Sequence, residues 1–386
     1  MLRSINHFSL HRINSTELRV VSDVAEGVLP VIQAEESVVR KYTQRTGWPH
    51  RWITLFVLED LQPLLRQLRQ GARPASLAFA PSENRDYHAR QNLSTADIAA
   101  LSERPVVNVY DLADLSTCNI FVNRREMMTQ HYWEDAQAMR GLMAHEHAHP
   151  LAENEITRAS RQIHFQVLDG RVTTPQPPPA PVLFGGAETG TTSETGNRLS
   201  KIPRVLDLLG EKLSLLAPRE ILTNEMTIQS SFSEDLLHLN LCNMDNAGAS
   251  IAGRTALAQH LQQEVAQGDL TEQETGLLLL VGDLNGFLPL ALEIAPFYRA
   301  GKPDEARALE QILETRVFPF LDPLAVKCYM DLRDHYIALS APSAPSSGNL
   351  PLSEMVAWSN TVLQILCQAL MVKDYSLQYE MGLSER

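Results

Sequence analysis

The N-terminal part of the chain alternates between two spacings of apolar residues. Over residues 18–28 apolar side chains recur every three or four positions, which predicts a helix capped by Thr16 and continuing past Pro30 to Arg40. Runs rich in β-branched and aromatic residues predict strands at residues 52–58, 76–80, 105–111 and 118–123, with short helices at 60–68 and 94–101. A helix over residues 134–149 follows them.

The chain after residue 150 is predicted to be mainly helical. Helices are expected at residues 153–168, 218–240, 254–267, 277–297, 303–317, 323–339 and 353–372. Thr271 and Glu274 form a capping-box pattern ahead of the fourth of these helices. Residues 173–200 and 341–349 are rich in Pro with Gly, Thr or Ser. Such stretches carry too little apolar surface to order themselves, which predicts a linker or lid in the first case and an exposed loop in the second.

This order of elements predicts an α+β fold in two lobes. Residues 1–170 are expected to form a mixed sheet with packed helices, ending in the helix at 134–149 and its successor. Residues 171–200 are expected to be a flexible linker, and residues 201–386 a mainly α-helical lobe. A chain of 386 residues is long enough to bury a large core in two domains.

Composition narrows the expected partners and location. The net charge of −13 predicts neither a nucleic-acid surface nor an anionic membrane surface, because both need clustered positive charge. The apolar residues 277–297 are interrupted by Asp283, Asn285 and Glu293, which favours a pair of core helices over a membrane span. The first 15 residues hold no apolar run typical of a signal peptide, and the four cysteines show no C-x-x-C spacing. We therefore expect a reduced, cytoplasmic protein.

The candidate chemistry lies in residues 145–149, which read H-E-H-A-H and so contain an H-E-x-x-H pattern. One helical turn separates His145 from His149, so both imidazoles can bind one metal ion. Glu146 lies beside them and can take a proton from a metal-bound water, which is the role of a general base. Because Pro150 follows directly, the helix is expected to end or kink at His149.

This residue order resembles that of the zincin metallopeptidases. The resemblance implies Zn²⁺ held by His145 and His149, Glu146 as the catalytic base, and a peptide or protein as substrate. The preceding layout is similar to the upper lobe of zincins, where an edge strand just before the active-site helix pairs with extended substrate. By that resemblance residues 118–123 are the candidate substrate strand, and an ordinary core strand is the alternative.

A catalytic zinc ion usually has three protein ligands, so another residue must join the two histidines. Glu225 falls in the middle of an apolar helical stripe formed by Ile221, Leu222, Ile228, Phe232, Leu236 and Leu239. A carboxylate in that position needs a partner, either a metal or a cation. In gluzincins the third ligand is a glutamate on a separate helix after the histidines, and by that resemblance Glu225 is the predicted ligand. A buried salt bridge is the alternative interpretation of Glu225, and Glu153 and Glu155 are alternate ligands.

Two functions from different classes follow from these patterns. The first is a zinc-dependent metallopeptidase. The second is a non-catalytic helical interaction protein whose metal site is structural or absent. Metal content after purification distinguishes the two.

Overall fold

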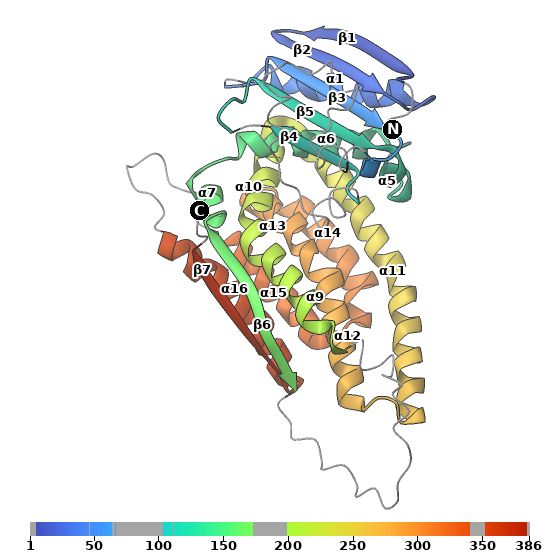
Figure 1. Ribbon diagram of the computed structural model, residues 1–386, viewed down its shortest axis with the longest axis vertical. Helices are drawn as coiled ribbons and strands as arrows, with labels where there is room; N and C mark the ends of the chain where they lie inside the picture. The colour runs from blue at the N-terminus through green and yellow to red at the C-terminus, as the bar shows by residue number, and fades with distance from the viewer. Residues whose placement is uncertain are drawn as a thin grey trace, which may run out of the picture. The chain divides into compact units, whose positions relative to one another are not determined.

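The computed structural model describes residues 5–45, 47–63, 66, 103–110, 112–172, 199–339 and 352–383 (Figure 1). The chain forms two compact units. The first comprises Met1–Ala152 and Met226–Cys242, and the second comprises Glu153–Glu225 and Asn243–Arg386. The sequence-based division differs in two places: residues 153–170 belong to the second unit, and residues 226–242 return to the first.

A five-stranded mixed sheet forms the centre of the first unit. Its strands are β1 (His7–Ile13), β2 (Thr16–Ser22), β3 (Trp52–Leu58), β4 (Val106–Tyr110) and β5 (Thr117–Asn123), in the order β1-β2-β3-β5-β4. The three central strands run parallel, and β1 and β4 pair antiparallel at the two edges. Every residue of β5 is buried, as expected for a strand covered on both faces.

Two predictions about this sheet are wrong. The segment that begins at Thr16 is strand β2 and not a helix. Burial in β2 alternates only from Thr16 to Val20, where Glu17 and Arg19 are partly exposed, and Val20, Val21 and Ser22 are then all buried. The break in alternation let the apolar residues that follow Leu18 imitate a helical spacing. Residues 118–123 do form a strand, but it is the interior strand β5, and the edge next to it is β4. The candidate substrate strand is therefore the core strand of the alternative interpretation.

Three helices accompany the sheet: α1 (Val28–Tyr42), α5 (Arg124–Thr129) and α6 (Ala136–Leu151). Helix α1 packs along α6. The hydroxyl of Tyr42, at the end of α1, donates a 2.8 Å hydrogen bond to the carbonyl oxygen of Ala144 in α6. Tyr42 is fully buried, so this bond has no competition from water and joins the two helices firmly.

The returning segment 226–242 contains η3 (Ile228–Phe232) and the start of α11 (Ser233–Gln267). The helix predicted over residues 218–240 is interrupted here, since Ser230 has ψ 16° and Ser231 has φ 69°. Immediately after this kink, the Phe232 ring packs 5.0 Å from the ring of Tyr42. The kink therefore turns an aromatic side chain into the core of the first unit.

Helices α6 and α11 approach closely within the first unit. Arg140 of α6 pairs with Asp235 of α11 at 2.9 Å. Gly141, the next residue, permits the approach, because a Cβ atom there would lie 2.5 Å from the carbonyl oxygen of Asp235.

The described part of the second unit is helical apart from a two-stranded antiparallel sheet of β6 (Ile163–Val172) and β7 (Tyr375–Leu383). Its helices are α7 (Glu155–Ser160), α9 (Ile202–Glu211), η2 (Lys212–Leu216), most of α10 (Ala217–Thr227), the later part of α11, α12 (Glu272–Phe287), η4 (Leu288–Leu290), α13 (Ala291–Arg299), α14 (Pro303–Arg316), η5 (Phe318–Phe320), α15 (Pro323–Ile337) and α16 (Leu352–Val372). Helix α13 packs against α14 and α15, while β6 lies on α9 and β7 on α16. The helices predicted at 303–317, 323–339 and 353–372 are confirmed, whereas residues 254–267 are the end of the longer helix α11 and not a separate helix. The helix predicted at 153–168 is wrong in its second half, which is strand β6.

The apolar stretch at 277–297 forms two helices, as predicted. The hydroxyl of Thr271 accepts a hydrogen bond from the backbone N–H of Glu274, and the Glu274 carboxylate accepts one from the backbone N–H of Thr271, so the predicted capping box is confirmed. Buried Asp283 accepts hydrogen bonds of 3.0 and 2.9 Å from Arg254. By length and composition, the helical stretches Glu272–Arg299 and Leu352–Val372 are apolar enough to span a membrane. Core helices pass the same test, and most of the first stretch is buried within the protein.

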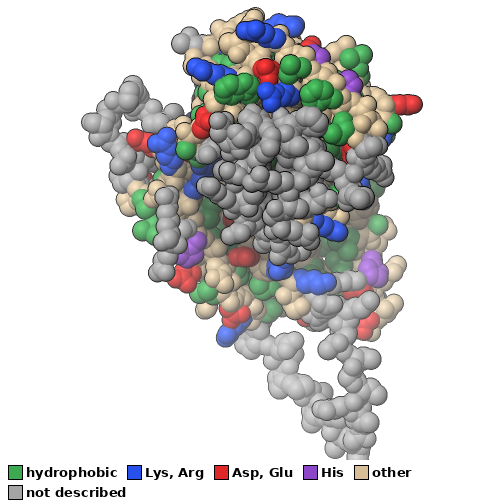
Figure 2. Space-filling model, turned by 45° about the horizontal axis from the view of Figure 1, so that its top comes forward, with side chains coloured by type: hydrophobic (Ala, Val, Ile, Leu, Met, Phe, Trp, Pro, Cys, Tyr) green, Lys and Arg blue, Asp and Glu red, His purple; other side chains and the backbone are tan. Residues whose placement is uncertain are grey.

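Several predicted elements lie outside the described residues. They are the strand at 76–80, the helix at 94–101, the loop at 341–349, most of the stretch at 173–200 and part of the helix at 60–68. On the face drawn in Figure 2, Lys and Arg side chains of the described residues are interspersed with Asp and Glu side chains.

Gly141→Ala should lower the free energy of unfolding by about 1–3 kcal/mol, because the added methyl group meets a helix backbone that cannot rotate away. Gly282→Ala in α12 is the matched control, since nothing lies within 4 Å of a Cβ atom there. That change should be neutral or stabilise its helix by up to about 1 kcal/mol. Urea unfolding of both variants measures the difference, and equal effects would contradict the close approach of α6 and α11.

Candidate metal centre

Helix α6 carries the H-E-x-x-H pattern and extends past it. The helix begins after Asp135, whose carboxylate accepts hydrogen bonds from the backbone N–H groups of Gln137 and Ala138. It continues to Leu151 with Pro150 inside it. The prediction that the helix ends or kinks at His149 is therefore wrong.

Asn108, in edge strand β4, compensates for the donor that Pro150 lacks. In a regular helix the N–H of residue 150 would donate to the carbonyl oxygen of Glu146. Here the side-chain amide of Asn108 donates to that oxygen at 2.8 Å. The backbone N–H of Asn108 also donates to Oε2 of Glu146 at 3.1 Å. One strand residue thus satisfies the interrupted helix backbone and orients the glutamate side chain.

His145 and His149 lie side by side, one turn apart on α6. Their ring centroids are 4.7 Å apart, with an interplanar angle of 81°. Nε2 of His149 lies 4.0 Å from Oε2 of Glu146. Glu146 and His149 are 7% and 4% exposed, and His145 is partly exposed. The structure therefore groups two nitrogen ligands with a neighbouring carboxylate, which is the arrangement a hydrolytic metal site uses.

Glu225 lies in the part of α10 that belongs to the second unit. The six apolar residues of its predicted stripe are all buried. Its carboxylate accepts hydrogen bonds from the guanidinium of Arg299, with nitrogen-to-oxygen distances of 2.9 and 3.0 Å. Glu225 was predicted to need either a metal or a cation as partner. In the structure the partner is the cation Arg299, which agrees with the salt-bridge alternative.

The two alternate ligands have different surroundings. Glu153 accepts hydrogen bonds of 2.8 and 3.1 Å from the guanidinium of Arg161, and its side chain is 6% exposed. Glu155 is exposed and begins the short helix α7. Glu153 therefore has a charge partner, while Glu155 remains in contact with solvent.

Among the described residues of the first unit, two further groups of side chains could bind a metal, with ligand atoms no more than 4.8 Å apart. One group is Asp135, His238 and Cys242, and the other is His50, Cys118 and His147. In the first group the Asp135 carboxylate already caps α6 and lies 2.6 Å from Nε2 of His238. The second group is fully buried. Neither group could be predicted from the sequence, because its members come from distant segments and only His147 lies within the motif.

Comparison of the chain with protein-family models, curated proteins and solved structures finds no match.

Asn108→Ala should lower the free energy of unfolding by about 1–3 kcal/mol, because the Glu146 carbonyl loses its donor. In a Pro150→Ala background the same change should cost less, since residue 150 then supplies a backbone N–H. Urea unfolding of the wild type, both single variants and the double variant gives the coupling energy. Additive effects would mean that Asn108 does not compensate for Pro150.

Proposed function

We propose that the protein is a zinc-dependent metallopeptidase in which His145 and His149 bind Zn²⁺ and Glu146 activates a zinc-bound water. The observation that carries this proposal is the grouping on α6 of two histidine rings and a buried carboxylate. Two imidazoles supply part of the ligand set of a catalytic zinc ion, and zinc makes a bound water acidic enough to lose a proton near neutral pH.

The setting of Glu146 supports its assignment as the general base. Its Oε2 accepts a hydrogen bond from the backbone N–H of Asn108, which limits the directions in which the carboxylate can point. A base held by the backbone is already oriented before substrate binds, which lowers the cost of reaching the reactive arrangement. Glu146 follows His145 directly in the helix, so it is less suited to coordinate the same ion than to act on its water.

The position of β4 supports a peptide or protein as substrate. Among the described strands β4 lies at the edge of the sheet. An edge strand can bind an extended peptide by adding it as a further strand, here on either side of Asn108, whose own N–H is taken by Glu146. The link from Asn108 to Glu146 places this edge next to the proposed base. β4 thus takes the role that the sequence had suggested for residues 118–123.

A cytoplasmic location belongs to the same proposal. All four cysteines, Cys118, Cys242, Cys328 and Cys367, are free thiols. Free thiols are typical of proteins that work in a reducing compartment.

The identity of the third zinc ligand is limited by the ion pairs that two of the candidate glutamates already form. Glu225 can coordinate zinc only if its carboxylate gives up a contact with Arg299. Glu153 is similarly engaged by Arg161. Glu155 has no such cost of release, because it is exposed.

Glu146→Gln should retain zinc but reduce peptide hydrolysis by about 10²–10⁴-fold, because an amide cannot accept the proton of the water. His149→Ala should lose zinc and activity together. Zinc stoichiometry and hydrolysis of a peptide library are measured for both variants, with Glu234→Gln, an exposed glutamate, as the control. A wild type that holds zinc and cleaves no peptide would favour the non-catalytic interaction protein with a structural metal.

A glutamine scan should identify the third ligand. Replacing the ligand should weaken zinc binding, with partial rescue of activity by added metal, whereas the other replacements should leave zinc content unchanged. The scan covers the three candidates, Glu153, Glu155 and Glu225.

Arg299→Gln is the control for the effect of the ion pair. If Glu225 is a ligand, Glu225→Gln loses zinc and Arg299→Gln does not. If Glu225 serves only the salt bridge, both variants lose stability and both keep zinc.

A further inference from the structure

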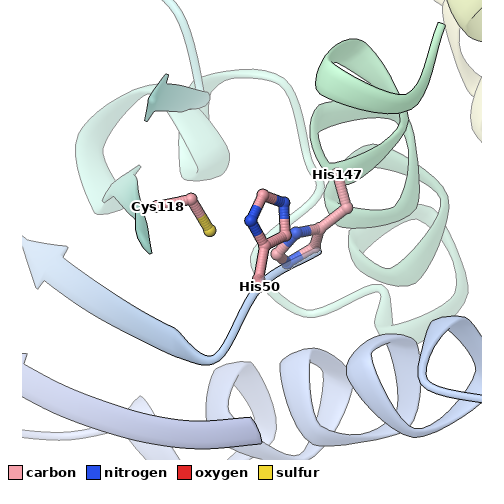
Figure 3. Close-up of side chains that lie close together, drawn as sticks. All are labelled: His50, Cys118 and His147. Atoms are coloured by element: carbon pink, nitrogen blue, oxygen red, sulfur yellow. The ribbon is translucent and has the colours of Figure 1, made fainter. Parts of the chain in front are cut away.

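His147 lies on the opposite side of α6 from His145 and His149. Successive helical residues are 100° apart, so a residue midway between the two histidines points away from both. His147 is completely buried, as are Cys118 of β5 and His50 in the loop before β3. Figure 3 shows the two imidazole rings next to each other, with the sulfur of Cys118 pointing toward them. Nitrogen and sulfur ligand atoms of the three residues lie within 4.8 Å of one another.

The hydrogen bonds of the two rings leave one nitrogen of each without a partner. Nδ1 of His50 lies 2.5 Å from the carbonyl oxygen of Leu115. A carbonyl only accepts, so Nδ1 carries the hydrogen, and Nε2 of the neutral ring has a lone pair. Nε2 of His147 lies 2.7 Å from Oε1 of Glu35. With the carboxylate as acceptor, Nε2 carries the hydrogen, and Nδ1 of His147 has the lone pair.

Neither of these two nitrogens has a hydrogen-bond partner among the described residues. Two buried lone pairs without a donor are unfavourable, and a cation bound by both rings would supply the missing partner.

We propose that Nε2 of His50, Sγ of Cys118 and Nδ1 of His147 bind a zinc ion that is separate from the one proposed at His145 and His149. Two imidazoles and a thiolate are ligands that zinc prefers. Three protein ligands leave a fourth position for a small molecule such as water.

The surroundings of the three residues match those of a metal site. Metal-binding histidines usually donate their second N–H to a carboxylate or a backbone carbonyl, which orients the ring. His147 donates to Glu35 and His50 to the carbonyl of Leu115, so both patterns are present. Zinc binds the thiolate and displaces its proton. Zn²⁺, the thiolate of Cys118 and the carboxylate of Glu35 together carry no net charge, which removes the cost of an isolated buried charge.

The site has a neighbouring opening and does not depend on the proposed peptidase function. A pocket of about 190 Å³ is lined by Tyr42, Trp48 and four other residues. The Trp48 ring lies 5.6 Å from the ring of His147 and 4.7 Å from that of His50. Movement of Trp48 would therefore give a metal ion a path to the three ligands. Once bound, the ion would hold α6 to β5 and to the loop before β3.

Cobalt substitution tests this site separately from the histidine pair. The full chain, purified without a histidine tag and stripped by a chelator, is titrated with Co²⁺ or Zn²⁺. We expect the thiolate-to-cobalt charge-transfer band in the near ultraviolet, because Cys118 supplies sulfur, whereas the ligands proposed around His145 and His149 contain none. The band should persist in His149→Ala and disappear in Cys118→Ser and His50→Gln. Cys242→Ser, which removes the thiol of the group formed with Asp135 and His238, is the control and should retain the band.

The contact of Glu35 with His147 and the thermal stability of the protein give two further tests. Glu35→Gln should keep the band and weaken zinc binding by about 10–100-fold. Adding zinc should raise the Tm of the stripped wild type. His149→Ala lacks the other proposed site, so adding zinc to this stripped variant should also raise its Tm, and stripping it again should lower the Tm. A wild type without the band would overturn the proposal, as would a folded Cys118→Ser protein with unchanged zinc content. In that case a proton shared between Nε2 of His50 and Nδ1 of His147 would satisfy both nitrogens.

Discussion

The buried contact between Glu35 and His147 sets the orientation of α6, and the candidate metal centre depends on that orientation. Both side chains are completely inaccessible to water, so rotating the helix about its axis would leave two buried polar groups without partners. Such a loss costs several kcal/mol. With His147 fixed toward α1, the flanking histidines of the same helix must point the other way. The bond from Tyr42 to the Ala144 carbonyl fixes the helix at a second point.

Much of the architecture could be predicted because its signals are local. The strands at 52–58, 105–111 and 118–123, the histidine helix and the later helices all have the composition or periodicity of their elements. β2 imitates a helix because its alternation of buried and partly exposed residues stops at Val20, and the apolar positions that follow recur at three or four residues. Strands β6 and β7 pair across some 200 residues of sequence, and the position of β4 at the sheet edge is likewise a property of pairing. Neither the pairing of β6 with β7 nor the edge position of β4 can be recognised from a short segment of sequence.

The candidate site shows the same division between local and distant information. The spacing of His145, Glu146 and His149 could be predicted, as could the need of Glu225 for a partner. The identity of that partner, Arg299, could not, because it comes from a different helix. Pro150 is the clearest case. The local rule ends the helix before it, and a side chain 38 residues from Glu146 overrides the rule. The grouping of His50, Cys118 and His147 depends on three elements and has no local pattern.

The return of Met226–Cys242 to the first unit has a consequence for biosynthesis. A ribosome adds about 5–20 residues per second, and domains generally fold as they emerge. Here the N-terminal sheet and α6 emerge early, but Phe232, which packs on Tyr42, and Asp235, which pairs with Arg140, follow only after the whole of Glu153–Glu225 has been made. Until then the nascent chain carries an incomplete core with exposed apolar surface. Folding of the first unit is thus coupled to translation of the second, and a truncation before residue 242 would leave the sheet without part of its core.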